Sequence, residues 1–343
     1  MCQGKDVKII TTIESNREMI LRSKTVKRSE LRQVEVFKSG FLPRRFQVDL
    51  KERLTIPPDN YPEPEKIFAV SDIEGNFNTL INLLQQHDVV DEYLHWEFGK
   101  GHLVINGDVF DRGYHVTEML WLIYQLENEA EKQGGRVHLI LGNHEVINLR
   151  GDLRYITAKY VTLDSLVTKE ENLTYIDLFG LDSELGCWLR TKNAIERIGN
   201  KLFSHTGISM RVADSRFSIR EMNKLVRSAI DKTKNELTKN ETLIIRRDGI
   251  LWDRSYFQSD EKKPQVTQKE LETILSQYGA EYFVVGHTIL DHPVRLYQGR
   301  LCAIDVDPPN DHQIDFPPFH AFGVLIVGNQ FYRACENGYL VEI

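Results

Sequence analysis

The chain has 343 residues, of which 41% are hydrophobic and 27% charged, an ordinary globular composition. That is enough apolar material for one large domain or two modest ones, each with its own core. The formal net charge of −7 excludes a strong basic field for nucleic acid or anionic lipid, so any phosphate binding must rely on local arginines and metal ions.

Cysteine usage and hydropathy point to a reducing compartment. The cysteines Cys2, Cys187, Cys302 and Cys335 are far apart and form no Cys-x-x-Cys pair, so we expect free thiols. Residues 1–30 lack the apolar core of a signal peptide, and no stretch reaches the roughly 18 apolar residues of a membrane span. These features predict a soluble cytoplasmic protein.

Residues 1–65 contain no recognisable chemistry and end in a proline-rich connector, Pro57–Pro64. We expect them to form an N-terminal extension that packs on the core. From Lys66, short apolar runs alternate with amphipathic helical segments, which predicts a layered α/β domain over residues 66–343. The helix-prone insert 151–197 breaks this alternation and is expected to form a cap beside the site.

Five predicted strands each end in a polar cluster. The clusters are Asp72–Gly75, Gly107–Gly113, Gly142–Glu145, His205 and Gly286–His287. Ligands of open α/β sheets bind at the carboxyl ends of the strands, and these clusters supply carboxylates, an amide oxygen and imidazoles. Alone, each cluster also fits a turn, a surface ion pair or a structural histidine; together and in this order they predict a metal site.

The ordered clusters resemble those of the binuclear metallophosphoesterases, and of the phosphoprotein phosphatase family in particular. The runs Gly142–Tyr155 and Val285–Thr288 are similar to the Shewanella-like and Rhizobiales-like bacterial-type branch, and the resemblance covers Lys66–Asp307. It implies a calcineurin-like β-sandwich with helices on both faces, in four α/β/β/α layers.

The resemblance also implies two divalent metal ions. Asp108 would bridge them, because two cations about 3.5–4 Å apart need a shared carboxylate to offset their repulsion. Asp72 would bind the first ion, and Asn143, His205 and His287 would bind the second. The chain departs from the family at Glu74, where a histidine is usual.

The all-oxygen first site that results favours Mn²⁺, with Fe, Mg or Zn also possible, and an alkaline-shifted pH optimum. Some related esterases have a second histidine where this chain has Ile289, so no replacement imidazole is evident. The alternative is that Glu74 points away and water fills its place.

Four further residues take catalytic roles by the same resemblance. A metal-bridging hydroxide would attack phosphorus in line, while Arg112 grips the phosphate through its bidentate fork. His144 would protonate the leaving oxygen and Asp111 would hold it in position. Arg254 is a candidate second phosphate clamp, with a surface ion pair as the alternative.

The predicted function is a phosphoric monoester hydrolase, a protein phosphatase acting on phosphotyrosine, phosphoserine or phosphothreonine. Its partner would be a phosphorylated protein or peptide, or a small phosphate ester, with no nucleic acid and no membrane; the oligomeric state is not readable from the sequence. A symmetrical dinucleoside-tetraphosphate hydrolase shares the metal motifs, and a catalytically impaired scaffold is the third alternative. Tyr155 and Trp188 in the insert either form a stacking wall or pack within the cap.

Overall fold

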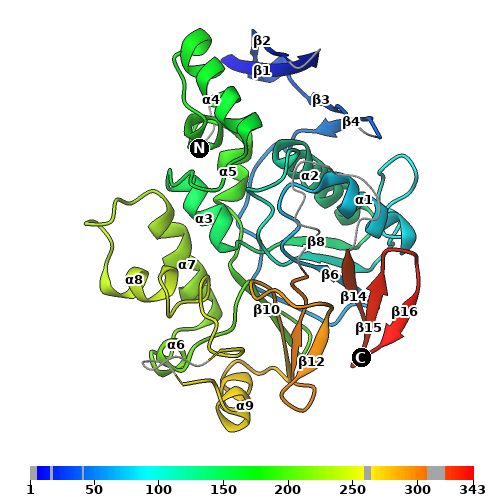
Figure 1. The fold of residues 1–343 in the computed structure, drawn as a ribbon, viewed down its shortest axis with the longest axis vertical. Helices are drawn as coiled ribbons and strands as arrows, with labels where there is room; N and C mark the ends of the chain where they lie inside the picture. Colours follow the sequence, from blue (N-terminus) through cyan, green and yellow to red (C-terminus); the bar gives the residue numbers. More distant parts are fainter. Residues whose placement is uncertain (1–5, 16–17, 41, 259–263, 307–320) are drawn as a thin grey trace.

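The computed structural model describes residues 6–343 except 16–17, 41, 259–263 and 307–320. Two six-stranded sheets form the centre of the molecule (Figure 1). The first sheet has the strand order β16-β15-β14-β6-β7-β8, and the second has the order β12-β13-β11-β10-β9-β5.

Each sheet mixes parallel and antiparallel strands. The first contains β6 (Ile67–Val70), β7 (His102–Ile105), β8 (Arg136–Leu139), β14 (Phe322–Val327), β15 (Gln330–Cys335) and β16 (Leu340–Glu342). The second contains β5 (Asn60–Tyr61), β9 (Ile195–Ile198), β10 (Lys201–Ser204), β11 (Tyr282–Val285), β12 (Val294–Leu296) and β13 (Leu301–Ala303). The strands β6, β7 and β8 are parallel, as are β10, β11 and β13, so each group ends at one edge of its sheet.

The central strands are apolar on both sides because both faces of each sheet are covered. In β6, Ile67 and Ala69 join a core between the sheets, whereas Phe68 and Val70 face the helices. This alternation follows from the two-residue period of a strand. The inter-sheet core consists of Tyr61, Ile67, Ala69, Val104, Ile140, Ile198, Phe203, Val284, Cys302, Ile304, Val324, Ile326 and Phe331.

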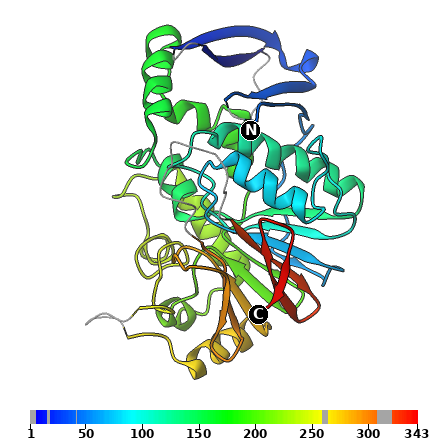
Figure 2. The same ribbon diagram turned by 45° about the vertical axis from the view of Figure 1, so that its right-hand side comes forward.

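Helices cover the outer faces of the two sheets and complete the layered architecture (Figures 1 and 2). The helices are α1 (Phe77–Gln86), α2 (Val116–Lys132), α3 (Asn143–Leu149), α4 (Ala158–Glu171), α5 (Glu184–Leu189), α6 (Met210–Asp214), α7 (Ile219–Ile230), α8 (Lys239–Ile245) and α9 (Gln268–Gln277), with 3-10 turns η1 (Arg28–Glu30) and η2 (Ile176–Phe179). The helix α9 begins at a capping box of Thr267 and Glu270, as the sequence predicts.

The N-terminal residues form two hairpins, β1 (Asp6–Ser15) with β2 (Glu18–Lys27) and β3 (Gln33–Lys38) with β4 (Arg44–Asp49). The second hairpin lies against α2, and β2 reaches α4 in the insert (Figure 2). Within the insert, Trp188 is buried and donates a hydrogen bond to Glu127 of α2, so it packs against α2 and does not line the cavity at the site. The boundaries at residues 65, 151 and 197 stay predictions.

Two findings bear on the expected compartment. In the part of the chain that the structure describes, no helix has the length and apolar character needed to cross a membrane. Cys302 and Cys335 are free thiols, but Cys187 is disulfide-bonded, so the prediction of free thiols is wrong at that position; Cys2 lies outside the described residues.

Candidate metal centre

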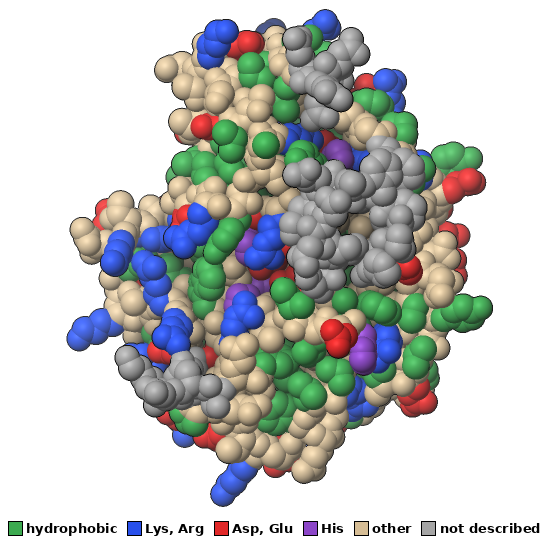
Figure 3. All heavy atoms as spheres, in the orientation of Figure 1, with side chains coloured by type: hydrophobic (Ala, Val, Ile, Leu, Met, Phe, Trp, Pro, Cys, Tyr) green, Lys and Arg blue, Asp and Glu red, His purple; other side chains and the backbone are tan. Residues whose placement is uncertain are grey.

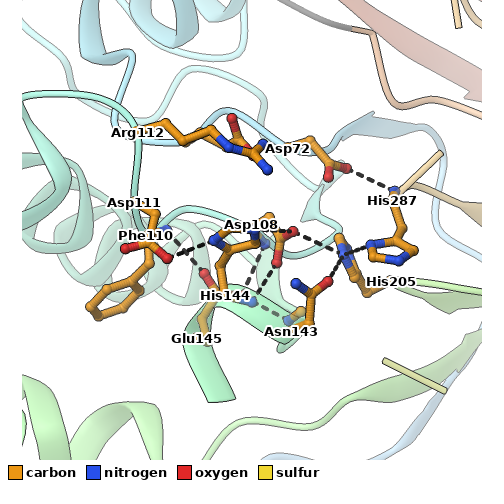
Figure 4. Close-up of polar contacts among 12 residues, drawn as sticks. Asp72, Asp108, Phe110, Asp111, Arg112, Asn143, His144, Glu145, His205 and His287 are labelled. Atoms are coloured by element: carbon orange, nitrogen blue, oxygen red, sulfur yellow. Dashed lines mark hydrogen bonds and ion pairs between the residues drawn. The ribbon is translucent and has the colours of Figure 1, made fainter. Parts of the chain in front are cut away.

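The polar clusters meet where β6, β7, β8, β10 and β11 end. The loops after β6 and β7 are joined by two backbone hydrogen bonds, from Asp72 N to Gly107 O (3.0 Å) and from Glu74 N to Asp108 O (2.9 Å). Figure 4 shows the side chains of these loops turned toward a common centre, and Figure 3 shows histidine, acidic and basic side chains meeting in a hollow of the surface.

Asp108 lies at this centre. Its Oδ1 accepts a hydrogen bond from the backbone N–H of His144 (2.9 Å), and its Oδ2 lies 3.0 Å from His205 Nε2 (Figure 4). Burial alone would raise the pKa of Asp108, but the imidazoles of His205 and His144 outweigh it and hold the pKa well below its usual range. Asp108 is therefore an ionised carboxylate shared between two groups of side chains.

The first of these groups contains both oxygen and nitrogen donor atoms, from Asp108, Asn143, His205 and His287. His205 Nε2 lies 2.9 Å from Asn143 Oδ1, 3.0 Å from Asp108 Oδ2 and 3.2 Å from His287 Nδ1. His205 Nδ1 is 3.0 Å from the carbonyl of Asn106, which fixes the ring and leaves Nε2 directed at the cluster. Ligands of a divalent cation converge at such separations.

The pKa values of the two histidines of this group are shifted in opposite directions. Burial lowers the pKa of His205, but Asp108 and Asp72 outweigh it and raise the pKa to about 10. Burial and the neighbouring His205 lower the pKa of His287 to about 2, so its imidazole is neutral and able to coordinate. The Nε2 atom of His287 is buried with no hydrogen-bond partner among the described residues.

The second group comprises Glu74, Asp108 and His144, whose ligand atoms lie within 4.8 Å of one another. Glu74 is buried and turned into the site, but its carboxylate is paired with the guanidinium of Arg112. It therefore does not point away from the site. Asp72 Oδ2 accepts hydrogen bonds from Ser71 Oγ (2.5 Å) and from the backbone N–H of His287 (3.1 Å).

His144 and Asp111 form a buried pair. His144 Nδ1 lies 2.6 Å from Asp111 Oδ2, and Asn148 donates a second hydrogen bond to that oxygen (2.8 Å). Burial would lower the pKa of His144, but the carboxylates of Asp108 and Asp111 outweigh it and raise the pKa above its usual value. The other ring nitrogen, Nε2, faces Asp108 Oδ2 at 3.7 Å. The imidazole of His144 thus presents Nε2 to the centre of the site.

Glu145 belongs to the Gly142–Glu145 cluster, but the sequence pattern predicts no role for it. Its side chain is fully buried and accepts hydrogen bonds from the backbone N–H groups of Asp108 (2.9 Å), Val109 (2.7 Å), Phe110 (3.2 Å) and Gly142 (2.7 Å). One carboxylate therefore fixes the loop that carries Asp108 to the start of α3. No signal in a single sequence shows where these donors come from.

The backbone itself is unusual at the site. Six of the ten predicted site residues have a positive φ: Asp72, Glu74, Asp108, Asp111, Arg112 and His287. Such left-handed conformations are uncommon outside glycine and cluster at functional sites. Gly107 has a φ of +92°, and a Cβ there would lie 2.6 Å from His205 Nδ1, so only glycine fits beside the imidazole.

A cavity of about 110 Å³ lies over the centre. Eight predicted site residues line it: Asp72, Glu74, Asp108, Arg112, Asn143, His144, Arg254 and His287. The other two, His205 and Asp111, lie behind it in contact with Asp108 and His144. The cavity is also lined by Tyr155, Trp252, Ile289 and Asp305, of which sequence reasoning missed Asp305 as a site residue.

Comparison with known proteins places this site in a family. Residues 65–290 match the calcineurin-like phosphoesterase family. The chain belongs to this family. It is 31% identical over 234 residues to Shewanella-like protein phosphatase 1 of Plasmodium berghei, which covers 67% of this chain and 63% of that protein. Shewanella-like protein phosphatase 2 of Arabidopsis thaliana is 27% identical over 61% of this chain and 50% of that protein.

A solved structure resembles nearly the whole chain. The cold-active protein-tyrosine phosphatase of a psychrophilic Shewanella species has a TM-score of 0.81 and 32% identity, and the match covers 94% of this chain and 92% of that one. The predicted family, the calcineurin-like α/β fold and the enzyme class, a phosphoric ester hydrolase, are therefore confirmed. Membership of this metallophosphoesterase family implies divalent metal ions.

Proposed function

We propose that the protein is a protein phosphatase that removes phosphate from tyrosine, serine or threonine side chains. The relatives named above are protein phosphatases, and one of them is a protein-tyrosine phosphatase. The aligned segment spans only part of the Plasmodium and Arabidopsis proteins, so the support comes from the site as much as from the names.

The residues fit two divalent cations that share Asp108. Asn143, His205 and His287 would hold one ion, and Asp72 with Glu74 would hold the other. The unpartnered Nε2 of His287 and the donor atoms packed around His205 Nε2 support this assignment. When bound, two such ions would make water a strong nucleophile near neutral pH and offset charge on the phosphoryl oxygens.

The observation that carries the proposal is the His144–Asp111 pair. A serine or threonine alkoxide is strongly basic and needs a proton as it leaves. Asp111, 2.6 Å from Nδ1, stabilises the imidazolium and orients Nε2 toward the metal-ligand groups. His144 is therefore placed to donate its Nε2 proton to the leaving oxygen. This intact pair speaks against a catalytically impaired scaffold.

Arg112 and Arg254 would hold the phosphate, since both line the cavity. A planar guanidinium matches two phosphoryl oxygens at once, whereas a lysine would be a point charge. Arg112 is paired with Glu74 and lies 5.7 Å from the centroid of the Tyr155 ring. Phosphate binding would draw Arg112 from this carboxylate, which a metal ion could then take.

Tyr155 and Trp252 give the cavity aromatic edges. Tyr155 is 39% exposed, and its ring centroid is 5.1 Å from that of His144. The centroid of the Trp252 ring is 5.9 Å from that of His287. Aromatic rings at these places suit the phenyl ring of phosphotyrosine. No cation other than Arg112 and Arg254 lines the cavity among the described residues, which disfavours the phosphate chain of a dinucleotide.

The test is phosphate release by metal-stripped protein with Mn²⁺, Mg²⁺ or Zn²⁺ added back. Phosphotyrosine and phosphothreonine peptides should be hydrolysed, and His144→Asn should slow turnover of the phosphothreonine peptide by about 10²–10⁴-fold. Hydrolysis of a dinucleoside tetraphosphate without turnover of either peptide would replace the proposal with the nucleotide hydrolase. If no substrate is hydrolysed with any of these metals, the catalytically impaired scaffold becomes the remaining explanation.

A further inference from the structure

The metal position beside Asp72 is short of ligands. The carboxylate of Glu74, which would serve this position, also pairs with Arg112. Ile289 also lines the cavity, but its hydrocarbon side chain cannot coordinate. Apart from the shared Asp108, this position depends on Asp72 and on one carboxylate that a guanidinium already engages.

A sixth strand delivers a carboxylate to the same edge. Strand β13 runs parallel to β11, with Ala303 opposite Val285, and Ile304 N donates to Val285 O (2.8 Å). The chain therefore leaves β13 where the segment carrying His287 leaves β11. The backbone carbonyl of the next residue, Asp305, accepts from Leu290 N (3.1 Å), which fixes it beside that segment.

Asp305 is turned into the site and lacks partners. Its side chain lines the cavity together with Asp72, Glu74 and Asp108, although the residue is only 3% exposed. Among the described residues its carboxylate has no hydrogen bond and no ion pair. A buried carboxyl group is normally hydrogen-bonded, ion-paired or bound to a metal ion, so a cation in this cavity would supply the missing partner.

Arg254 is the other candidate partner, since it lines the same cavity. The structure places no ion pair between Arg254 and Asp305, and Arg254 is exposed whereas Asp305 is buried. The carboxylates of Asp72 and Asp108 also act on Asp305, alongside the cationic groups of His205 and Arg254, and they repel an ionised neighbour unless a cation lies between them.

We propose that Asp305 is a carboxylate ligand of the metal centre that holds the divalent ion beside Asp72. This inference rests on the proposed function, because it requires two ions in the cavity. An oxygen donor here also favours Mn²⁺ or Mg²⁺ over Zn²⁺ at this position.

The experiment is calorimetric titration of the metal-stripped full chain with Mn²⁺. Wild type should bind two ions. Asp305→Asn should weaken one binding event by about 10–100-fold, the range for losing a supporting group of a metal site. The second event should be unchanged. Asp214→Asn, an exposed carboxylate on α6, is the matched control and should behave as wild type.

Two further measurements separate a ligand from a structural residue. Without metal, Asp305→Asn should melt no lower than wild type, because the carboxyl group has no hydrogen bond or ion pair to lose, whereas the rise in melting temperature on adding Mn²⁺ should shrink. Adding Glu74→His to Asp305→Asn should restore Mn²⁺ affinity by returning an imidazole.

Three results overturn the inference or its basis, and they are distinguishable. Unchanged affinity for both Mn²⁺ ions in Asp305→Asn refutes the ligand role. Unchanged metal affinity with weakened inhibition by inorganic phosphate assigns Asp305 to positioning Arg254 instead. Wild-type protein that binds no divalent ion and hydrolyses no phosphate ester refutes the proposed function itself.

Discussion

Replacing His144 with asparagine should slow the hydrolysis of different phosphate esters to different extents. The asparagine amide can still donate to Asp111, which lies 2.6 Å from His144 Nδ1 in the wild type, but it has no counterpart of Nε2. A positioned general acid contributes about 10²–10⁴-fold to rate, or about 3–5 kcal/mol of barrier. Losses of that size are expected for an alkyl phosphate such as phosphothreonine, whose leaving oxygen must be protonated.

For para-nitrophenyl phosphate the loss should be under about tenfold, because its phenolate leaves readily without a proton. The assay is kcat for both esters in saturating Mn²⁺, with the Mn²⁺ affinity measured alongside. Equal losses on the two esters would refute proton donation. If Mn²⁺ affinity fell together with both rates, His144 would be a metal ligand.

Three other perturbations follow from the structure. Glu145→Gln places an amide NH₂ against two of the four backbone N–H groups that donate to Glu145, so urea unfolding should show a loss of about 3 kcal/mol of stability. The control is Glu272→Gln at an exposed position, and equal stability of the Glu145 variant and wild type would contradict the role of Glu145 in fixing the Asp108 loop. Burial raises the pKa of Glu118, but Lys159 (3.0 Å) and His115 outweigh it and hold the pKa at about 2, below the usual 4.5. This pair contributes up to about 3 kcal/mol above pH 4.5, which is lost as the pH falls toward 2. Glu118→Gln should therefore flatten the dependence of unfolding free energy on pH between about 5 and 3, and an unchanged slope would contradict it. Chelation should lower the melting temperature, and Mn²⁺ at 100 times its dissociation constant should restore about 2.7 kcal/mol; a melting temperature indifferent to metal would contradict the binuclear site.

The sequence predicted strands and helix starts correctly where these depend on residues close together in the chain. Apolar runs such as Ile67–Val70 are strands because both of their faces are buried, and the Thr267–Glu270 capping box begins α9 as expected. The polar clusters could be placed at strand ends because each directly follows such a run. The ordering of motifs then identified the family and suggested ten candidate site residues, eight of which line one cavity.

Long-range pairing decided what local patterns leave open. The C-terminal strand β14 enters the first sheet antiparallel beside β6, and β13 pairs with β11, although more than 250 residues separate β6 from β14. Hydrophobic periodicity reports which faces are buried but not which strand lies alongside. For this reason Asp305, after β13, gave no signal as a site residue.

By itself, the sequence determined the layered α/β class, the chemistry of the ligand set and its order along the chain. Only the tertiary structure decided that Glu74 faces Arg112, that Glu145 clamps the Asp108 loop through four backbone N–H groups, and that Asp305 joins the cavity. The physical reason is that residue types and spacings act over a few residues. The direction of a buried side chain depends instead on the loops that meet it from other strands, and on left-handed backbone conformations that only the assembled site maintains.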